Sequence, residues 1–153
     1  MREILFRGKR VDNGEWVYGD LVRHYENQRA FILAEQLAYT TTECGINRII
    51  SERYFEVIHE TLGMYTGFQD SKGRRIYDGD ILRLAGSYEE TDGSMRPYEE
   101  IHKIIWLKGC FYAHNEKGFP YWLLLFEVIE GLHDGETYEI VGNIHDEGED
   151  END

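Results

Sequence analysis

The stretch that decides the fold runs from residue 63 to residue 81 and reads GMYTGFQDSKGRRIYDGDI. It contains two turn sequences, Asp70–Gly73 and Asp78–Asp80, and each is followed by a short run with apolar residues. Glycine admits the positive backbone angles of tight turns, and short apolar runs between turns are typical of β-strands. We therefore expect strands at 75–77 and 81–84 that are joined by turns.

Short apolar or alternating runs continue on both sides of this stretch. Bounded by polar turn residues, they predict further strands at residues 4–6, 16–22, 30–34, 101–107, 110–113, 121–129 and 138–144. The run YWLLLFEVI at 121–129 is strongly apolar, so we expect it to be the most buried strand. By contrast, GSYEETDGSMRP at 86–97 is polar and rich in turn residues, which predicts an exposed, mobile loop.

Three stretches before residue 67 are ambiguous. Residues 39–43 (YTTTE) fit a strand or a loop, and residues 46–58 fit a helix in part and a strand in part. Residues 61–66 contain Gly63, so we expect no more than one turn of helix there.

The elements together predict a mainly β fold, with a β-rich α+β fold as the alternative. We expect an N-terminal β-rich segment over 1–57, a small SH3-like barrel-type module over 58–146 and an acidic, disordered tail over 147–153. A Gly-Asp pair followed by alternating apolar residues is common at strand entries of small SH3-like barrels. Such a pair occurs in two similar stretches, 13–23 and 72–83, which indicate either a duplicated β module or convergence on a frequent β pattern.

The chain is strongly acidic, with a formal charge of −14 from 30 acidic and 16 basic residues. Such a surface repels phosphate backbones and anionic lipids, which argues against nucleic acid and membrane partners. Six of the carboxylates lie at 146–153, in the sequence DEGEDEND. This tail is either a solubilising terminus or an arm that engages a basic partner.

The N-terminus and the cysteines indicate a compartment. MREILFRGKR lacks the apolar core of a signal peptide, and no apolar run approaches the roughly 18 residues of a membrane span. We therefore predict a cytoplasmic protein with free thiols, with a disulfide between Cys44 and Cys110 as the alternative. Cys110 begins a strand-like apolar stretch, so we expect a buried small hydrophobe rather than a nucleophile.

The motifs of phosphate, dinucleotide and zinc sites (GxxxxGK[ST], GxGxxG and HExxH) do not occur in the sequence. We therefore expect no cofactor and no metal. Surface or packing positions are expected for the six histidines, His24, His59, His102, His114, His133 and His145. An enzymatic site would instead need several of them to converge with Asp or Glu in a pocket. The pairs Glu89–Glu90 and Glu99–Glu100 are expected to be solvated.

Residues 63–81 resemble the hallmark of the YopX family, which reads G-x-Y-T-G, then a polar turn with D-x-x-G, then I-Y-[DE]-G-D-[IV]. ILFRGK at 4–9 with GEWVYG at 14–19 resembles the opening of the family, and VGNIH at 141–145 resembles its close. The resemblance thus extends from the first residues to about residue 146, without the acidic tail. One departure is His59, where family members often carry proline, so a rigid turn is not expected there.

The resemblance implies a phage- or prophage-encoded accessory protein with a mostly β fold and no established activity. No catalytic, cofactor-binding or metal residue can be carried over from the family. The residues that match its motifs fit turns and barrel corners: Tyr65, Thr66, Gly67, Asp70, Gly73, Ile76, Tyr77, Gly79, Asp80, Gly142 and Asn143.

Two classes of function therefore compete. The preferred prediction is a protein-binding or assembly module that engages a host or phage protein. The alternatives are an enzyme with an unrecognised active site and an acidic DNA mimic that inhibits a host nucleic-acid-binding protein. Because short β modules leave strand edges that a second copy can pair with, we also expect a homo-oligomer, most simply a dimer.

Overall fold

The computed structural model describes residues 3–34, 53–118 and 122–146. The chain divides into two compact units, Met1–Tyr65 and Thr66–Asp153. The sequence placed a boundary earlier, after residue 57. The ambiguous residues 39–43, most of 46–58, Cys44 and the acidic tail at 147–153 lie outside the described residues.

The first unit is an antiparallel sheet in the order β4-β3-β2-β1. Its strands are β1 (Phe6–Lys9), β2 (Trp16–Arg23), β3 (Ala30–Ala34) and β4 (Tyr54–Val57). A 3-10 turn, η1 (His59–Thr61), leads into β5 (Gly63–Gln69), whose first residues pair with β1. The core of this unit is formed by Val17, Ala30, Ile32 and Val57.

Local sequence predicts much of the first unit correctly. The expected strands at 16–22 and 30–34 are present as β2 and β3, and β2 continues without a break through Gly19 and Asp20. Residues 61–66 agree with the limit of one helical turn, because only Thr61, at the end of η1, is helical and β5 begins at Gly63. The first residues of β5 pair with Phe6 and Arg7 of β1, and Tyr65, Thr66 and Phe68 are residue types that favour strands.

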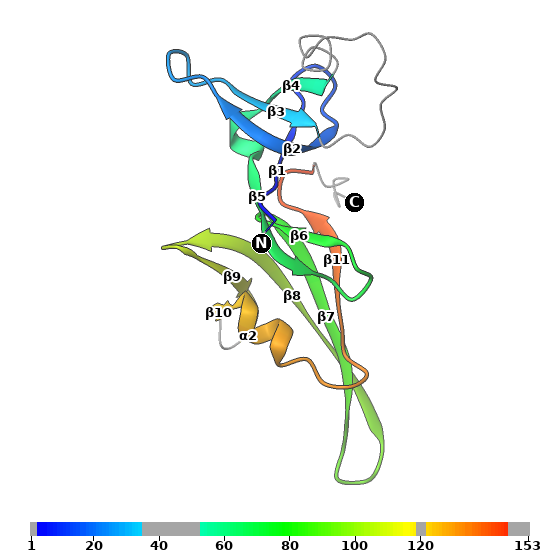
Figure 1. Ribbon diagram of the computed structural model, residues 1–153. Helices are drawn as coiled ribbons and strands as arrows, with labels where there is room; N and C mark the ends of the chain where they lie inside the picture. The colour runs from blue at the N-terminus through cyan, green and yellow to red at the C-terminus, as the bar shows by residue number, and fades with distance from the viewer. Residues whose placement is uncertain (1–2, 35–52, 119–121, 147–153) are drawn as a thin grey trace. The chain divides into compact units, whose positions relative to one another are not determined.

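The second unit is built on a five-stranded antiparallel sheet in the order β10-β9-β8-β7-β11. Its elements are β6 (Arg75–Tyr77), which lies beside β5, then β7 (Asp80–Glu89), β8 (Met95–Leu107), β9 (Cys110–Asn115), β10 (Trp122–Leu124), α2 (Leu125–Glu130) and β11 (Thr137–Asn143). The helix α2 lies against one face of this sheet (Figure 1). Between them is the core, formed by Ile76, Leu82, Ile104, Ala113, Leu125 and Tyr138.

The mainly β prediction is confirmed, whereas the SH3-like barrel is not. Within the described residues neither sheet closes on itself, and the five-stranded sheet ends at the edge strands β10 and β11. In the same part of the chain, no helix is long and apolar enough to cross a membrane.

Two expectations for the second unit are wrong. Residues 122–130 form a short strand and then a helix, because Leu125, Val128 and Ile129 follow helical spacing and pack on the core. Residues 86–97 form a β-hairpin extension rather than a loop, since β7 and β8 pair as far as Glu89 and Met95. This hairpin projects beyond the neighbouring strands (Figure 1).

Cys110 also differs from the expectation. It carries a free thiol and is exposed, because it lies at the first position of β9, opposite Leu107 in the turn from β8. The core positions of β9 belong to the alternate residues, including Ala113.

Gly79, between β6 and β7, supports the first testable prediction. Its φ is +91°, and a Cβ built there would meet Ile144 Cγ1 at 3.4 Å. Because branched side chains resist positive φ, Gly79→Val should lower the free energy of unfolding by at least about 1 kcal/mol. A thermal melt measures this, with Gly142→Val as the control, since Gly142 has an ordinary φ and open space around it. An unchanged melting temperature for Gly79→Val would contradict the prediction.

Candidate functional site

Asp70 of the family-like motif holds the turn after β5 to the last strand. Its Oδ1 accepts the backbone N–H groups of Lys72 at 3.0 Å and Arg74 at 2.9 Å. Its Oδ2 accepts the Arg74 Nε–H at 2.9 Å and the backbone N–H of Ile140 in β11 at 3.1 Å. Burial alone would raise the pKa of this carboxyl, but these hydrogen bonds outweigh burial and hold the pKa below its usual range.

Asp80 ties the second turn to the end of β11 in the same way. Its Oδ2 accepts the backbone N–H of Tyr77 at 2.8 Å, and its Oδ1 accepts the Asn143 side-chain N–H at 3.3 Å. Gly79 donates its backbone N–H to the Ile104 carbonyl at 2.8 Å and accepts the N–H of Ile144 at 2.9 Å. The motifs at 63–81 and 141–145 therefore meet in space.

The other motif residues lie in turns, strands and the core. Gly67 and Gly73 have positive φ, and Gly142 adjoins an irregularity in the pairing of β11 with β7. The buried positions are Tyr65, Thr66, Ile76 and Tyr77. None of the eleven motif residues lines the cleft described below, and a structural role for them stays a prediction.

Within each unit, the described histidines do not gather into one site. Among the described residues, no group of three or more His, Cys, Asp or Glu is arranged to hold a metal ion. His24 contacts Tyr54 and Phe31, His114 lies against Trp122, and His59 begins η1. His133 and His145 lie in the turns on either side of β11. His102 is buried, and its ring is hydrogen-bonded to a carboxylate.

His102 is fully buried between β7 and β9 and uses both ring nitrogens. The Tyr138 hydroxyl lies 3.0 Å from Nδ1, and Glu100 Oε2 lies 3.0 Å from Nε2. Because a carboxylate only accepts hydrogen bonds, Nε2–H donates to Glu100, and in the neutral ring Nδ1 then accepts the Tyr138 O–H. Burial, followed by the charge of Glu100, raises the pKa of Tyr138, so its hydroxyl keeps its proton. These hydrogen bonds, from Tyr138 through His102 to Glu100, fix the position of Glu100.

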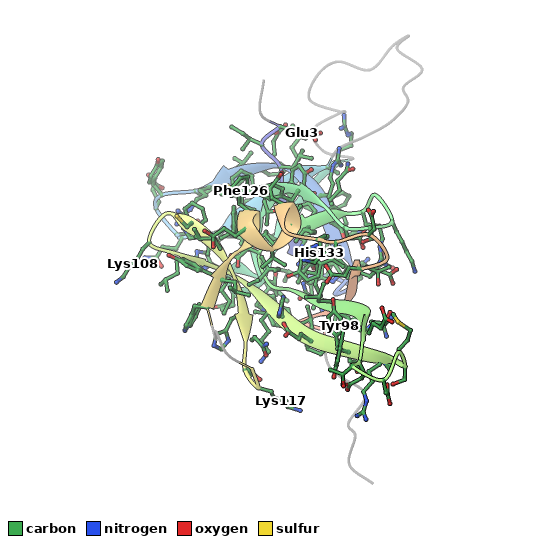
Figure 2. All side chains as sticks on the ribbon, turned by 90° about the horizontal axis from the view of Figure 1, so that it is seen from below. Glu3, Tyr98, Lys108, Lys117, Phe126 and His133 are labelled. Carbon is green, nitrogen blue, oxygen red and sulfur yellow. The ribbon has the colours of Figure 1, made fainter. Side chains whose placement is uncertain are left out.

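A cleft of about 570 Å³ lies next to Glu100, at the place where β9 leaves β8. Its walls are Glu99, Glu100, Ile101 and Lys103 of β8 and residues 115–118. Lys103 Nζ donates to Glu116 Oε1 at 2.5 Å across this cleft. Hydrogen bonding to Lys103 is the main cause that lowers the pKa of Glu116. In Figure 2, Tyr98 lies on the projecting hairpin and Lys117 lies just past the end of β9.

The sheet face opposite α2, here called the outer face, is apolar. Strand alternation relative to buried Ile104 and Ala113 places these residues on it: Ile101, Ile105 and Leu107 of β8, Tyr112 and His114 of β9, and Trp122 and Leu124 of β10. The Trp122 ring lies 4.1 Å from that of His114 and 5.9 Å from that of Tyr112, between centroids. Trp122 and Leu107 nevertheless stay 46% and 42% exposed.

The YopX family model, described as YopX protein, matches residues 5–149. The chain belongs to the YopX family. A crystal structure of protein EF1440 from Enterococcus faecalis is similar to this YopX chain over 95% of each chain, with a TM-score of 0.51 and 18% sequence identity. That likeness concerns the fold alone. No curated protein matches the YopX chain.

Sequence reasoning missed the cleft of this YopX-family protein and the hydrogen bonds that connect His102 with Glu100 and Tyr138. The signal was the two-residue period of YEEIHKIIW at 98–106, which places Tyr98, Glu100 and His102 on one face of β8. Tyr138 lies 36 residues from His102, so their contact depends on the register of β7 with both β8 and β11.

Tyr138→Phe should destabilise the protein by about 1.5 kcal/mol, because the buried Nδ1 of His102 loses its hydrogen-bond donor. Urea denaturation measures the change. Tyr98→Phe is the matched control, since the Tyr98 hydroxyl donates to Glu136 in a partly exposed position. We expect a clearly smaller loss there. Equal losses in the free energy of unfolding for the two variants would contradict the expected contribution of the buried hydrogen bond between Tyr138 and His102.

Proposed function

We propose that this YopX protein is a phage- or prophage-encoded protein-binding module that acts in the bacterial host cytoplasm. The observation that carries this proposal is the outer face of the five-stranded sheet. Exposed Trp122 and Leu107 lie on it, and large exposed aromatic and aliphatic side chains on one face are typical of protein-binding surfaces.

The charges around the outer face indicate what kind of partner it fits. Two pairs of charged side chains on it already bind one another: Lys103 with Glu116 at 2.5 Å, and Arg83 with Glu139 at 3.9 Å. On the apolar part of this face, a partner therefore gains most from burying apolar area. We propose a host or phage protein that presents a complementary apolar surface.

The experiment compares outer-face variants with a control. A host protein captured by the intact chain is purified, and its affinity is measured for the wild type, Trp122→Ser and Leu107→Ser. We expect each variant to weaken binding by about tenfold or more, equivalent to about 1.4 kcal/mol. Tyr25→Ser is the control, because Tyr25 is 96% exposed in the first unit. Partners that bind all four proteins equally would refute the proposal.

The assembly version of the proposal has its own measurement. The chain has a mass of 18.0 kDa, so sedimentation distinguishes a monomer from a dimer. A dimer that Trp122→Ser and Leu107→Ser dissociate would identify a second copy as the partner of the outer face. A monomer across the accessible concentration range would rule out the expected homo-oligomer.

A further inference from the structure

The outer edge of β8 is only partly paired. β8 is 13 residues long, but β9 pairs with it only from His102 to Leu107. Residues 95–101 pair with β7 on one side, and the described residues contain no strand on the other side. An extended strand with unpaired backbone groups is a template on which another strand can form hydrogen bonds.

The hydrogen bonds of β8 show which backbone groups face this free edge. The Ile104 carbonyl accepts the N–H of Gly79, and the Trp106 N–H donates to Asp78, both on the β7 side. Backbone groups alternate sides along an antiparallel strand, and the register of β8 with β7 has no shift. Glu99 therefore directs both its N–H and its C=O to the free edge, whereas Ile101 lies on the same side next to the last pair of the β8–β9 ladder, His102 with Asn115.

Pro97 agrees with this assignment. It lies two residues before Glu99, so its missing N–H also falls on the free side, and the ladder with β7 loses no hydrogen bond. The free edge thus offers the carbonyl of Pro97 and both backbone groups of Glu99.

The surroundings of the edge are acidic. Residues 86–101 hold five carboxylates and one basic residue. Glu99, Glu100 and Ile101 also line the cleft of about 570 Å³, so the edge and the cleft form one site. Lys103 is already paired with Glu116, and Lys117 is exposed on the rim, whereas His102 and Tyr138 hold the Glu100 carboxylate in place.

We propose that the β8 edge at Glu99–Ile101 binds an extended, basic peptide segment of a partner protein by strand addition. The backbone of the segment pairs with Glu99, and one of its lysine or arginine side chains enters the cleft against Glu100. This inference rests on the proposed protein-binding function and names a partner class for it. A second copy of the chain fits less well, because two acidic hairpins repel each other.

Fluorescence anisotropy with defined peptides tests the proposal on the full chain. The probe is a labelled peptide of sequence TVKVRVT, which alternates β-formers with basic residues. The first control replaces its lysine and arginine by glutamate, and the second carries N-methyl groups on alternate backbone nitrogens. We expect the basic probe to bind and each control to bind at least about tenfold more weakly, the loss of about 1.4 kcal/mol.

A pair of variants at one position separates the backbone from the charge. Glu99→Gln and Glu99→Pro both remove the carboxylate, but only Glu99→Pro removes the N–H that faces the free edge. Glu99→Pro should bind the probe at least about fivefold more weakly than Glu99→Gln. Equal affinities of the two variants, or equal binding of the N-methylated probe, would overturn the proposal. The N-methylated probe decides alone if Glu99→Pro does not fold.

Two further outcomes distinguish a failure of the strand-addition proposal from a failure of the proposed protein-binding function. If no peptide binds while a captured partner still depends on Trp122 and Leu107, strand addition fails and the proposed function stands. If sedimentation shows a dimer that Glu99→Pro dissociates and Glu99→Gln does not, the edge pairs with a second copy and the basic peptide is the wrong occupant.

Discussion

Replacing Asp70 with alanine should lower the free energy of unfolding at pH 7 by about 3 kcal/mol, the largest loss expected for a single residue of the motif at 63–81. The Asp70 side chain is 0% exposed. Its removal leaves the partly buried N–H groups of Lys72, Arg74 and Ile140 without their acceptor. Urea denaturation measures the loss, and one below about 1 kcal/mol would contradict the prediction.

The same variant has an expected pH dependence. The folded-state pKa of Asp70 lies below its usual range, so its carboxylate stabilises the fold fully above the unfolded pKa of about 3.9. This contribution is lost as the pH falls through the lowered folded pKa. The difference between wild type and Asp70→Ala should therefore shrink below about pH 4. Asp92→Ala is the comparison at an exposed site. Hydrogen bonds from Ser94 lower the pKa of Asp92 as well, so its pH dependence should have the same sign, but a smaller amplitude because Asp92 is exposed.

Replacing Gly8 with alanine should lower the free energy of unfolding by about 2 kcal/mol. Gly8 in β1 lies so close to Val57 in β4 that a methyl group does not fit between them. A Cβ at Gly8 would lie 2.8 Å from Val57 Cβ and 2.9 Å from Val57 Cγ2. Val57 is buried in the core of the first unit and is β-branched, so it cannot turn aside easily. Gly142→Ala is the control, since a Cβ there meets no atom within 4 Å.

A double-mutant cycle identifies the cause. Val57→Ala alone leaves a cavity, and Gly8→Ala alone overpacks the same space. The double variant should be more stable than the sum of the two losses predicts, by at least about 1 kcal/mol. Additive losses would show that Gly8 is required for another reason.

Particular elements show which parts of the secondary structure can be predicted from local sequence. β2, β3 and β6 were predicted because turn residues with apolar runs between them determine short strands locally. α2 was missed although Leu125, Val128, Ile129 and Leu132 carry a helical period, because the apolar run at 121–129 hides it. The hairpin at 86–97 was missed for the opposite reason: its residues favour turns, and cross-strand pairs such as Arg96 with Glu90 hold it extended.

The sequence by itself determined the mainly β class, the YopX membership and the positions of the main turns. These depend on residue spacing and on glycine and aspartate in turns, which act over a few residues. Only the tertiary structure decided that Asp70 meets Ile140, that Gly8 meets Val57 and that His102 meets Tyr138. It also decided that β9 ends at Asn115, opposite His102, and leaves the β8 edge free beside a cleft. Each of these depends on strand register between distant segments, and register is set by the packing of the whole sheet rather than by any local pattern.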